Sequence, residues 1–494
     1  MKEKIDRIVN SRFGVEADKF YNSVWYVIAV GAICCIAHIA HIPAVGVVFL
    51  TLLLLPALLV CKNSFVLLPP LFMFGMIMGN AKDASDGYAN SPAKLAVLST
   101  AEIAVSAVFL SLLGLALVFN VLYYGKYKLL FKRAYLTISL AIMSGALIMG
   151  GIGAPTFDWH GTLAAVRLGI ITFVPYALLV NSGEYKGKKT VEYFAQMMIV
   201  TAVAMFFIVL VLFFGNDFII GDTNLYRFGM FGPNTGSAVV VIALPVTFYY
   251  VYSHKYGYLF MGLVVVELLT IFLCFSRASL LIAVPGTIIV ALALCFVKKD
   301  GRLAYWITVG VLALALIVVA LVLRRTLFDT ITGIKKSGDS GRFEIWRDGF
   351  MAWKSRPILG VGLYYLLVTD KLAFYSFHCT PLTYLYCAGI IGLAAYVYHR
   401  YTTVRLVFSA KLTAERVFVA LSVLAMLLNA LLDVAMTKAL HLTMYATMLA
   451  LIECDVRKMK EQAQQADSAA AEQIASPAER SEECALTDAD GTVE

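Results

Sequence analysis

Charge is scarce in this sequence: 15% of the 494 residues are Asp, Glu, Lys or Arg, whereas 61% are hydrophobic. The mean hydropathy of +0.81 indicates more apolar sequence than a water-soluble protein can bury in its core, so water-soluble folds are excluded. The bilayer must be the main solvent of such a chain. The composition therefore predicts an all-α, polytopic integral membrane protein surrounded by membrane lipids.

Signatures of several other protein classes are missing as well. No P-loop occurs, and the one Asp-x-Asp stands alone at 488–490, so we expect neither a metal nor a cofactor. The nine cysteines are scattered, mostly in apolar runs, which favours packing roles over a zinc site or a disulfide framework. The net charge of +8 is spread between apolar segments instead of forming a stripe, so no nucleic acid partner is expected.

Apolar runs divide most of the chain. A full transmembrane helix needs roughly 20 residues. Because some of the runs are short, we predict 12–14 transmembrane helices in one bundle. The runs are 21–41, 43–61, 65–80, 98–123, 134–153, 163–181, 193–214, 235–252, 258–275, 278–297, 303–323, 379–398, 417–436 and 439–453.

The predicted organisation has five parts. They are a cytoplasmic amphipathic segment (1–20), a transmembrane bundle (21–323), one large extracytoplasmic loop carrying amphipathic helices (324–378), the C-terminal transmembrane helices (379–453) and a disordered acidic cytoplasmic tail (454–494). The orientation follows from the basic residues, which cluster on alternate connections such as 126–133, 186–189 and 298–302.

The stretch 340–393 concentrates charge and aromatic residues in this otherwise apolar sequence. Its first part has aromatic residues at helical spacing, which predicts an amphipathic helix lying on the membrane surface. These residues are Phe343, Trp346, Phe350 and Trp353. Pro357 ends the predicted helix, and the glycines at 360 and 362 let the backbone turn.

His378 stands just ahead of a second predicted helix, because Pro381 favours the first turn of a helix. The positive end of that helix dipole disfavours an imidazolium, so the neutral ring, which can accept a proton, is favoured there. The alternative is an ordinary polar loop residue. A nucleophilic pair with Cys379 is a weaker idea, because sequence neighbours point in different directions.

Arginines predicted on the outer side are exceptions to the positive-inside pattern, so their presence there needs a structural or functional explanation. Arg277 separates two apolar runs, and an arginine at membrane depth is costly unless it is paired. The alternative is an arginine that snorkels to lipid phosphates.

Arg227 precedes the helix for which Asn234 is the predicted N-cap, and the alternative for it is an ordinary loop arginine. Arg342 and Arg347 lie on the predicted surface helix, where the alternative is an ordinary interfacial arginine. Arg227, Arg277, Arg342 and His378 all map to one side of the membrane. Together they suit a phosphorylated ligand, because a guanidinium offers phosphate a bidentate partner.

These motifs resemble the O-antigen ligase and O-antigen polymerase superfamily of polytopic bacterial glycosyltransferases. The resemblance covers about 227–393, where five motifs occur in the family's order and spacing. They are Arg227 to Asn234, Phe275-Ser276-Arg277-Ala278-Ser279, Ser340-Gly341-Arg342 with Trp346, Pro357 to Gly362, and His378 followed by 384–393. The chain departs from the family pattern at Cys379, where the family often has asparagine.

The resemblance implies transfer of a glycan from an undecaprenyl diphosphate carrier to an acceptor hydroxyl, on the outer face of the bacterial cytoplasmic membrane and without a metal. It implies His378 as the base and Arg277 and Arg342 as diphosphate ligands. From their positions we predict Arg227, Asn234 and Arg347 as further substrate contacts. A ligase would use a lipid core or another terminal acceptor, and a polymerase would use the growing repeat chain. A more distant alternative is a lipid-glycan transporter or flippase, which would line the bundle with charge from side to side.

Overall fold

The computed structural model of the chain describes residues 7, 9–77, 99–154, 157, 159–215, 232–274, 276–322, 324, 342–366, 372–374, 377–432 and 438–487. Almost all of this part is helical, because an apolar segment in a bilayer must satisfy its backbone polar groups internally. The prediction of a polytopic helical membrane protein is confirmed.

The first half of the chain contributes α-helices and short 3-10 helices. They are α2 (Arg12–Tyr21), α3 (Val24–Ile39), α4 (Pro43–Val60), η1 (Ser64–Leu67), α5 (Leu68–Met73), η2 (Phe74–Met76), α6 (Thr100–Tyr123), α7 (Tyr127–Leu130), α8 (Thr137–Met149), α9 (Trp159–Asn181) and α10 (Lys188–Gly215).

The second half contains the remaining helices and one small β-ribbon. Its elements are α11 (Pro233–Ser253), η3 (Gly257–Phe260), α12 (Met261–Leu273), α13 (Arg277–Val297), α14 (Arg302–Val322), α16 (Arg342–Ser355), β1 (Tyr364–Leu366), β2 (Leu372–Phe374), α17 (Thr380–Val407), α18 (Ala414–Leu432) and α19 (Ala439–Thr487).

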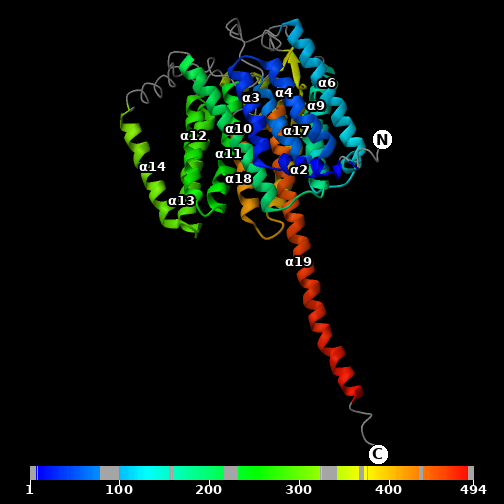
Figure 1. Cartoon of the computed structure of the whole chain (residues 1–494). Coiled ribbons are helices and arrows are strands. Elements are labelled where there is room, and N and C mark those ends of the chain that lie inside the picture. The colour runs from blue at the N-terminus through cyan, green and yellow to red at the C-terminus, as the bar shows by residue number, and fades with distance from the viewer. Residues whose placement is uncertain are drawn as a thin grey trace, which may run out of the picture.

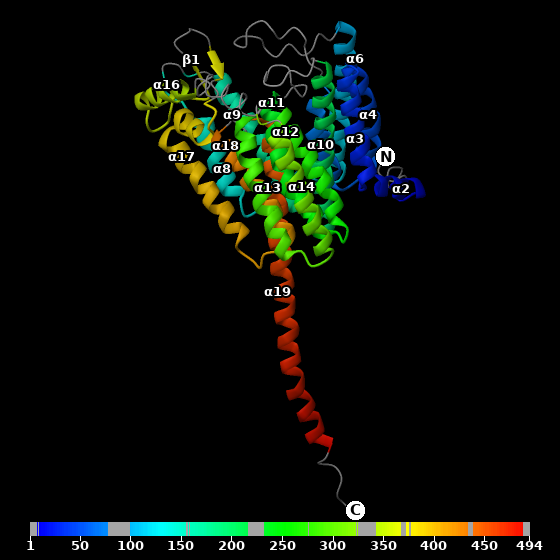
Figure 2. The ribbon, with the colours of Figure 1, turned by 90° about the vertical axis from the view of Figure 1, so that its left-hand side faces the viewer.

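The long helices lie side by side, and α19 projects far out of the bundle at one end (Figure 1). We call this the tail end and the opposite end the loop end. α16 and β1 lie at the loop end, above the bundle (Figure 2). The first part of α19 and all of α11 are deeply buried between other helices, and α14 stands at the margin with most of its surface exposed.

The predicted apolar runs all coincide with apolar helices. Nine helices of the described residues are long and apolar enough to cross a membrane, or ten if α2 and α3, bent by 67°, count as one span. The other runs correspond to four shorter apolar segments, Ser64–Met76, Thr137–Met149, Gly257–Leu273 and Arg302–Val318. The uncertainty in the predicted number therefore lies in short segments that are apolar but do not reach full span length.

Two regions differ from the sequence prediction. The connection after residue 363, expected to be a polar loop, contains the antiparallel ribbon β1–β2, in which Tyr364 pairs with Phe374; aromatic and branched residues favour such strands. The tail from about 461, expected to be disordered, continues α19 as a helix to Thr487. Its alanine, glutamine and glutamate content favours a helix even without a packing partner.

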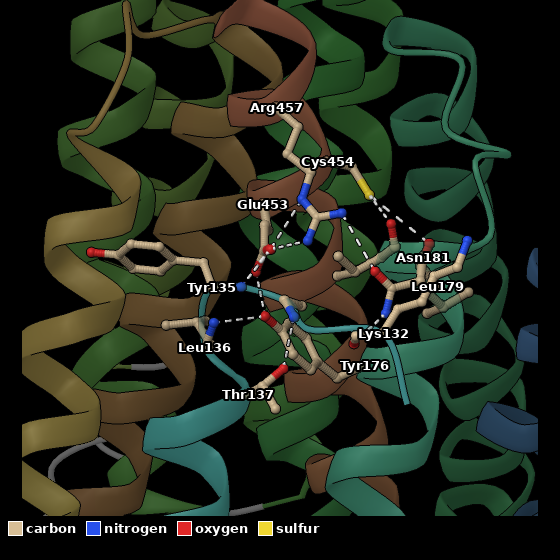
Figure 3. A network of polar contacts seen from close by, with 12 residues as sticks. Lys132, Tyr135, Leu136, Thr137, Tyr176, Leu179, Asn181, Glu453, Cys454 and Arg457 are labelled. Atoms are coloured by element: carbon tan, nitrogen blue, oxygen red, sulfur yellow. Dashed lines mark hydrogen bonds and ion pairs between the residues drawn. The ribbon is translucent and has the colours of Figure 1, made fainter. Parts of the chain in front are cut away.

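Buried polar contacts tie α19 to the tail-end loops (Figure 3). The Glu453 carboxylate accepts hydrogen bonds from the Tyr135 N–H at 2.8 Å, from the Tyr176 hydroxyl and from Arg457 Nη2 at 2.6 Å. Two residues later, the Asp455 carboxylate accepts a hydrogen bond from Arg416 Nε at 2.9 Å. Because these partners come from the connection before α8, from α9 and from α18, α19 holds the tail end together.

Candidate functional site

The helix predicted before Pro357 is present as α16, which ends two residues before this proline. Proline disfavours a helical conformation in the residue before it, so the helix ends there. The Phe343 and Phe350 rings are exposed, whereas Trp346 and Trp353 are half-buried. The aromatic face is therefore shared between the protein and the surrounding medium, as expected for a helix at a membrane surface.

Aromatic contacts fix α16 to the start of α17. The Trp346 Nε1–H donates to the Phe377 carbonyl at 2.7 Å, and the Tyr386 hydroxyl donates to the Trp346 carbonyl at 3.2 Å. The Phe377 and Tyr386 rings pack edge to face, with their centroids 4.5 Å apart. Gly349 permits this approach, because a Cβ there would come within 2.4 Å of the Phe377 ring. The residue next to His378 is thus held by both helices.

α17 is interrupted at Gly389, where φ is 66° and ψ is −160°. A broken helix leaves backbone groups without partners, which is expensive inside a membrane. The segment 357–362 supplies the missing partners. Three hydrogen bonds, written from N–H to carbonyl, join the two segments: Val361 to Tyr386 (3.0 Å), Gly362 to Cys387 (2.9 Å) and Ile390 to Pro357 (2.9 Å).

Glycines make this junction possible. A Cβ at Gly389 would lie 2.1 Å from the Ile358 carbonyl oxygen, and one at Gly360 would lie 2.5 Å from the Cys387 carbonyl carbon. Both residues also have positive φ, which a side chain would oppose. The end of α8 joins from the third side, where the Gly151 N–H donates to the Leu359 carbonyl at 3.0 Å. The segment 357–362 is therefore a backbone plug for the break in α17.

His378 lies in the connection between α16 and α17, one residue before the N-cap of α17. Cys379 is the N-cap, and Pro381 occupies the first turn, as the sequence predicted. His378 is half-buried and has a φ of 47°, an unfavourable region for a residue with a side chain. Such strain persists only where the surroundings impose it, and it is concentrated at functional sites.

Cys379 has an environment unsuited to nucleophilic chemistry. Its side chain is buried, and burial raises the pKa of the thiol. A raised pKa keeps the sulfur protonated, whereas nucleophilic attack needs the thiolate. Cys379 is therefore the N-cap residue of α17, and the candidate for proton transfer at this turn is the imidazole of His378.

Arg342 and Arg347 both belong to α16 but lie in different surroundings. Arg342 is the first residue of α16 and half-buried, and it shares a helix face with Trp346, four residues later. Because Trp346 holds the Phe377 carbonyl, Arg342 lies on the side of α16 that faces the His378 turn. Arg347 is exposed and forms an ion pair with the adjacent Asp348 at 3.7 Å.

Arg277 is the first residue of α13 and is exposed, above a buried cluster of hydroxyl and amide groups. Ser279 lies at the centre of this cluster, with no exposed surface. Four contacts build it: Ser276 Oγ to Ser279 Oγ (3.0 Å), Ser237 Oγ with Ser279 Oγ (2.9 Å), Asn429 Nδ2 to Ser279 Oγ (3.2 Å) and Ser237 Oγ to the Asn234 carbonyl (3.0 Å). The cluster joins the starts of α11 and α13 to the end of α18.

The prediction that Asn234 caps α11 is wrong. The N-cap is Gly232, and Asn234 lies inside the first turn after Pro233. Proline has no N–H to be capped and favours the first helical position, so the helix begins two residues before the expected point. Asn234 still lies beside the start of α13, through Ser237 and Ser279.

The structure thus brings the predicted residues into two groups at the loop end. One contains His378 and Arg342, and the other contains Arg277 and Asn234; Arg227 lies outside the described residues. The serine and asparagine cluster under Arg277 was not predicted, because isolated Ser and Asn residues give no sequence signal. In the described part of the chain, no three His, Cys, Asp or Glu side chains are placed to hold a metal ion.

Comparison with known proteins yields one match. Residues 262–397 match the family model described as O-antigen ligase. The matched range runs from α12 into α17, so it contains Arg277, Arg342 and His378. The resemblance to the O-antigen ligase superfamily is confirmed, and it supports a membrane glycosyltransferase of the ligase or polymerase kind. No curated protein matches the chain.

Proposed function

We propose that this protein transfers a glycan from an undecaprenyl-diphosphate-linked donor to an acceptor hydroxyl at the loop end of the bundle. One observation carries the proposal. Within the matched residues 262–397, His378 and Arg277 stand at the starts of two long membrane helices, α17 and α13, which both begin at the loop end. A candidate base and a candidate side chain for binding phosphate therefore lie at the same membrane face.

His378 acts as the general base in this proposal. The acceptor oxygen attacks the anomeric carbon of the donor, the bond from that carbon to the diphosphate oxygen breaks, and the acceptor proton passes to the imidazole. The diphosphate leaves with the bonding electron pair and stays on its lipid carrier. Direct attack of this kind inverts the configuration at the anomeric carbon.

Arg277 and Arg342 stabilise the departing diphosphate. Negative charge grows on the leaving group as the bond breaks, and fixed arginines stabilise that charge more than they stabilise the bound donor. Each of the two residues also stands at the first position of a helix, where the helix dipole favours an anion. Arg227, Asn234 and Arg347 are proposed as further substrate contacts, and the proposed chemistry uses no metal or other cofactor.

The loop end faces outward from the bacterial cytoplasmic membrane in this proposal. Basic residues on the connections at the tail end support this orientation, since such residues favour the cytoplasmic side. They include Lys126, Lys128, Lys132, Arg133, Lys186, Lys188, Lys189, Lys298, Lys299 and Lys411.

The acceptor divides the two versions of this function. A ligase transfers the glycan once to a lipid core or another terminal acceptor, whereas a polymerase adds it to a growing repeat chain. Both need the same base and the same diphosphate contacts, so the site serves either reaction. A flippase instead needs charge along the whole bundle, and the charged candidates in this chain gather at the loop end.

A transfer assay with purified protein tests the proposal. The protein in lipid nanodiscs receives an undecaprenyl-diphosphate-linked oligosaccharide and either a lipid-core acceptor or a second donor molecule. Mass spectrometry of the products then reports single transfer or repeat extension. Transfer to either acceptor with release of undecaprenyl diphosphate supports the proposal, and an intact donor with both acceptors contradicts it.

A further inference from the structure

A large apolar cleft opens on the membrane-facing side of the bundle between α11, α13 and α18. Its volume is about 500 Å³, and it is lined almost entirely by aliphatic side chains, with Leu281, Pro285 and Ile289 on α13 opposite Leu424 and Leu428 on α18. All of these lie within the helices that span the membrane. The cleft is therefore accessible to a hydrocarbon chain and not to a polar solute.

Prolines in two facing helices explain why the cleft exists. Pro245 lies inside α11 and Pro285 lies inside α13, and both line the cleft. Each proline removes a helical hydrogen bond and bends its helix. Gly286 follows Pro285 and adds no side chain, so the wall of α13 stays open at this level.

The upper end of the cleft meets the group around Arg277. Leu281, which lines the cleft, lies one turn below Arg277 on α13. On α18, Leu428 lines the cleft beside Asn429, whose amide donates to Ser279 Oγ at 3.2 Å. The loop end of the apolar cleft thus lies about one helical turn from Arg277, the first residue of α13. A lipid with a phosphate head group has a matching order, an apolar chain followed by an anionic group that a guanidinium can bind.

A second apolar cleft offers a comparison. It measures about 370 Å³ and lies between α17 and α18, lined by residues such as Val404, Val407 and Val417. These residues belong to the tail-end halves of their helices, away from the starts of α13 and α17. This second cleft shares Leu421 and Leu424 with the first, but none of its lining residues belongs to α11 or α13, which carry the group around Arg277.

We infer that the cleft between α11, α13 and α18 seats the polyprenyl chain of the donor and thereby presents its diphosphate to Arg277. The inference rests on the proposed function for the identity of the lipid. A seated chain fixes the height and direction of the diphosphate, which reduces the motion that must be lost when the reacting groups align. The carrier is thus recognised by its chain as well as by its charge.

Gly286→Trp is the variant that tests this inference. A Cβ at Gly286 meets no atom within 4 Å, so the indole extends into the cleft without disturbing the packing. Gly310→Trp on α14 is the matched control, because Gly310 is equally unobstructed but lies outside the cleft. Both changes replace a helical glycine, so neither lowers helix propensity.

The first measurement is photolabelling with a benzophenone-bearing polyprenyl diphosphate, followed by peptide mapping. We expect labels on α11, α13 and α18, lost in Gly286→Trp and kept in Gly310→Trp. Labels elsewhere, or labelling unchanged by Gly286→Trp, would overturn the inference. This readout needs no transfer, so a wild-type protein that is labelled in the cleft but transfers nothing rejects the proposed function and keeps the binding site.

The second measurement compares long-chain and short-chain donors in the transfer assay. In Gly286→Trp we expect KM for the undecaprenyl donor to rise roughly tenfold, about the factor for losing the burial of two methylene groups. KM for a geranyl donor, which is too short to fill the cleft, should stay within about twofold of the wild-type value. An equal rise for both donors would indicate general damage and contradict the inference.

Discussion

The two ends of the bundle use charge in opposite ways. At the tail end, Arg416 has no exposed side-chain surface, and it donates to Asp455 at 2.9 Å and to the carbonyls of Ala410 and Lys411 at 2.9 and 2.7 Å. At the loop end, Arg277 and Arg347 are exposed at helix surfaces. The same residue type is enclosed by protein groups in one place and presented outward in the other.

This contrast separates structural charge from charge available to a ligand. A buried ion pair needs all its partners, because removal of one leaves an uncompensated charge in a medium of low dielectric. An exposed arginine at a helix start contributes little to stability but can bind an anion. We therefore expect tail-end variants to lose stability and loop-end variants to lose activity.

The largest effect is expected at His378. His378→Ala should lower the transfer rate by about 10² to 10⁴, the usual contribution of a positioned general base. His378→Gly should lower it equally, although glycine accepts the φ of 47° better than histidine does. Single-turnover rates with the lipid-linked donor check both variants.

Thermal unfolding in detergent is the control for this pair. We expect His378→Gly to be at least as stable as the wild type, because relief of the left-handed backbone, worth about 1–2 kcal/mol, outweighs the entropy of about 0.4–1 kcal/mol that glycine adds to the unfolded chain. Activity within a few-fold of the wild type in either variant would remove the base from the mechanism. Diphosphate departure ahead of attack, with the proton lost to solvent, would then be the better account.

The second prediction concerns the buried pair at the tail end. Asp455→Ala should destabilise the protein by about 3–5 kcal/mol, because Arg416 stays buried without its countercharge. The measurement is the free energy of unfolding in mixed micelles. Lys188→Ala is the matched control, since its pair with Glu192 is partly exposed, and such pairs are worth about 0–1 kcal/mol. Equal losses in the free energy of unfolding in both variants would contradict the proposed difference between the two ends.

The third prediction is that Arg277→Lys and Arg342→Lys each lower the transfer rate by roughly 10- to 100-fold despite keeping the charge. The expected loss matches a charge-assisted hydrogen bond, worth about 1.5–3 kcal/mol, that a lysine cannot form in bidentate geometry. The unfolding midpoint should not move. Wild-type rates in both variants would instead mean that these arginines only interact with lipid headgroups.

The smallest effect is expected at Arg347. Its side chain is 73% exposed and already pairs with Asp348, so Arg347→Ala should change the transfer rate by about twofold or less. The same assay measures it, with Arg342→Ala on the same helix as the reference. A loss as large as that of Arg342→Ala would place Arg347 in the diphosphate site rather than at its margin.

The sequence predicts the elements of this fold better than their junctions. Hydropathy identified the apolar helices, and Pro357 and Pro381 marked the end of α16 and the start of α17. The break at Gly389 was not predicted, because its conformation depends on the plug 357–362, some 30 residues earlier in the chain. A Gly-Ile-Ile-Gly motif alone indicates only close helix packing.

The candidate site follows the same rule. The positions of His378 and Arg277 at helix starts could be predicted, because proline and local sequence determine where a helix begins. The buried cluster of Ser237, Ser279 and Asn429 could not, since its members come from three helices and none is unusual alone. The catalytic roles of His378, Arg277 and Arg342 stay predictions until transfer is measured.

The plugged break in α17 has a consequence for how the protein is made. The upper part of this helix has carbonyl groups whose donors lie in residues 357–362, so it is not a self-sufficient membrane segment. When residues 380–407 leave the ribosome, the plug has already been synthesised and must be on the correct side of the membrane to meet them. In the proposed orientation, insertion of α17 is therefore coupled to translocation of the loop before it.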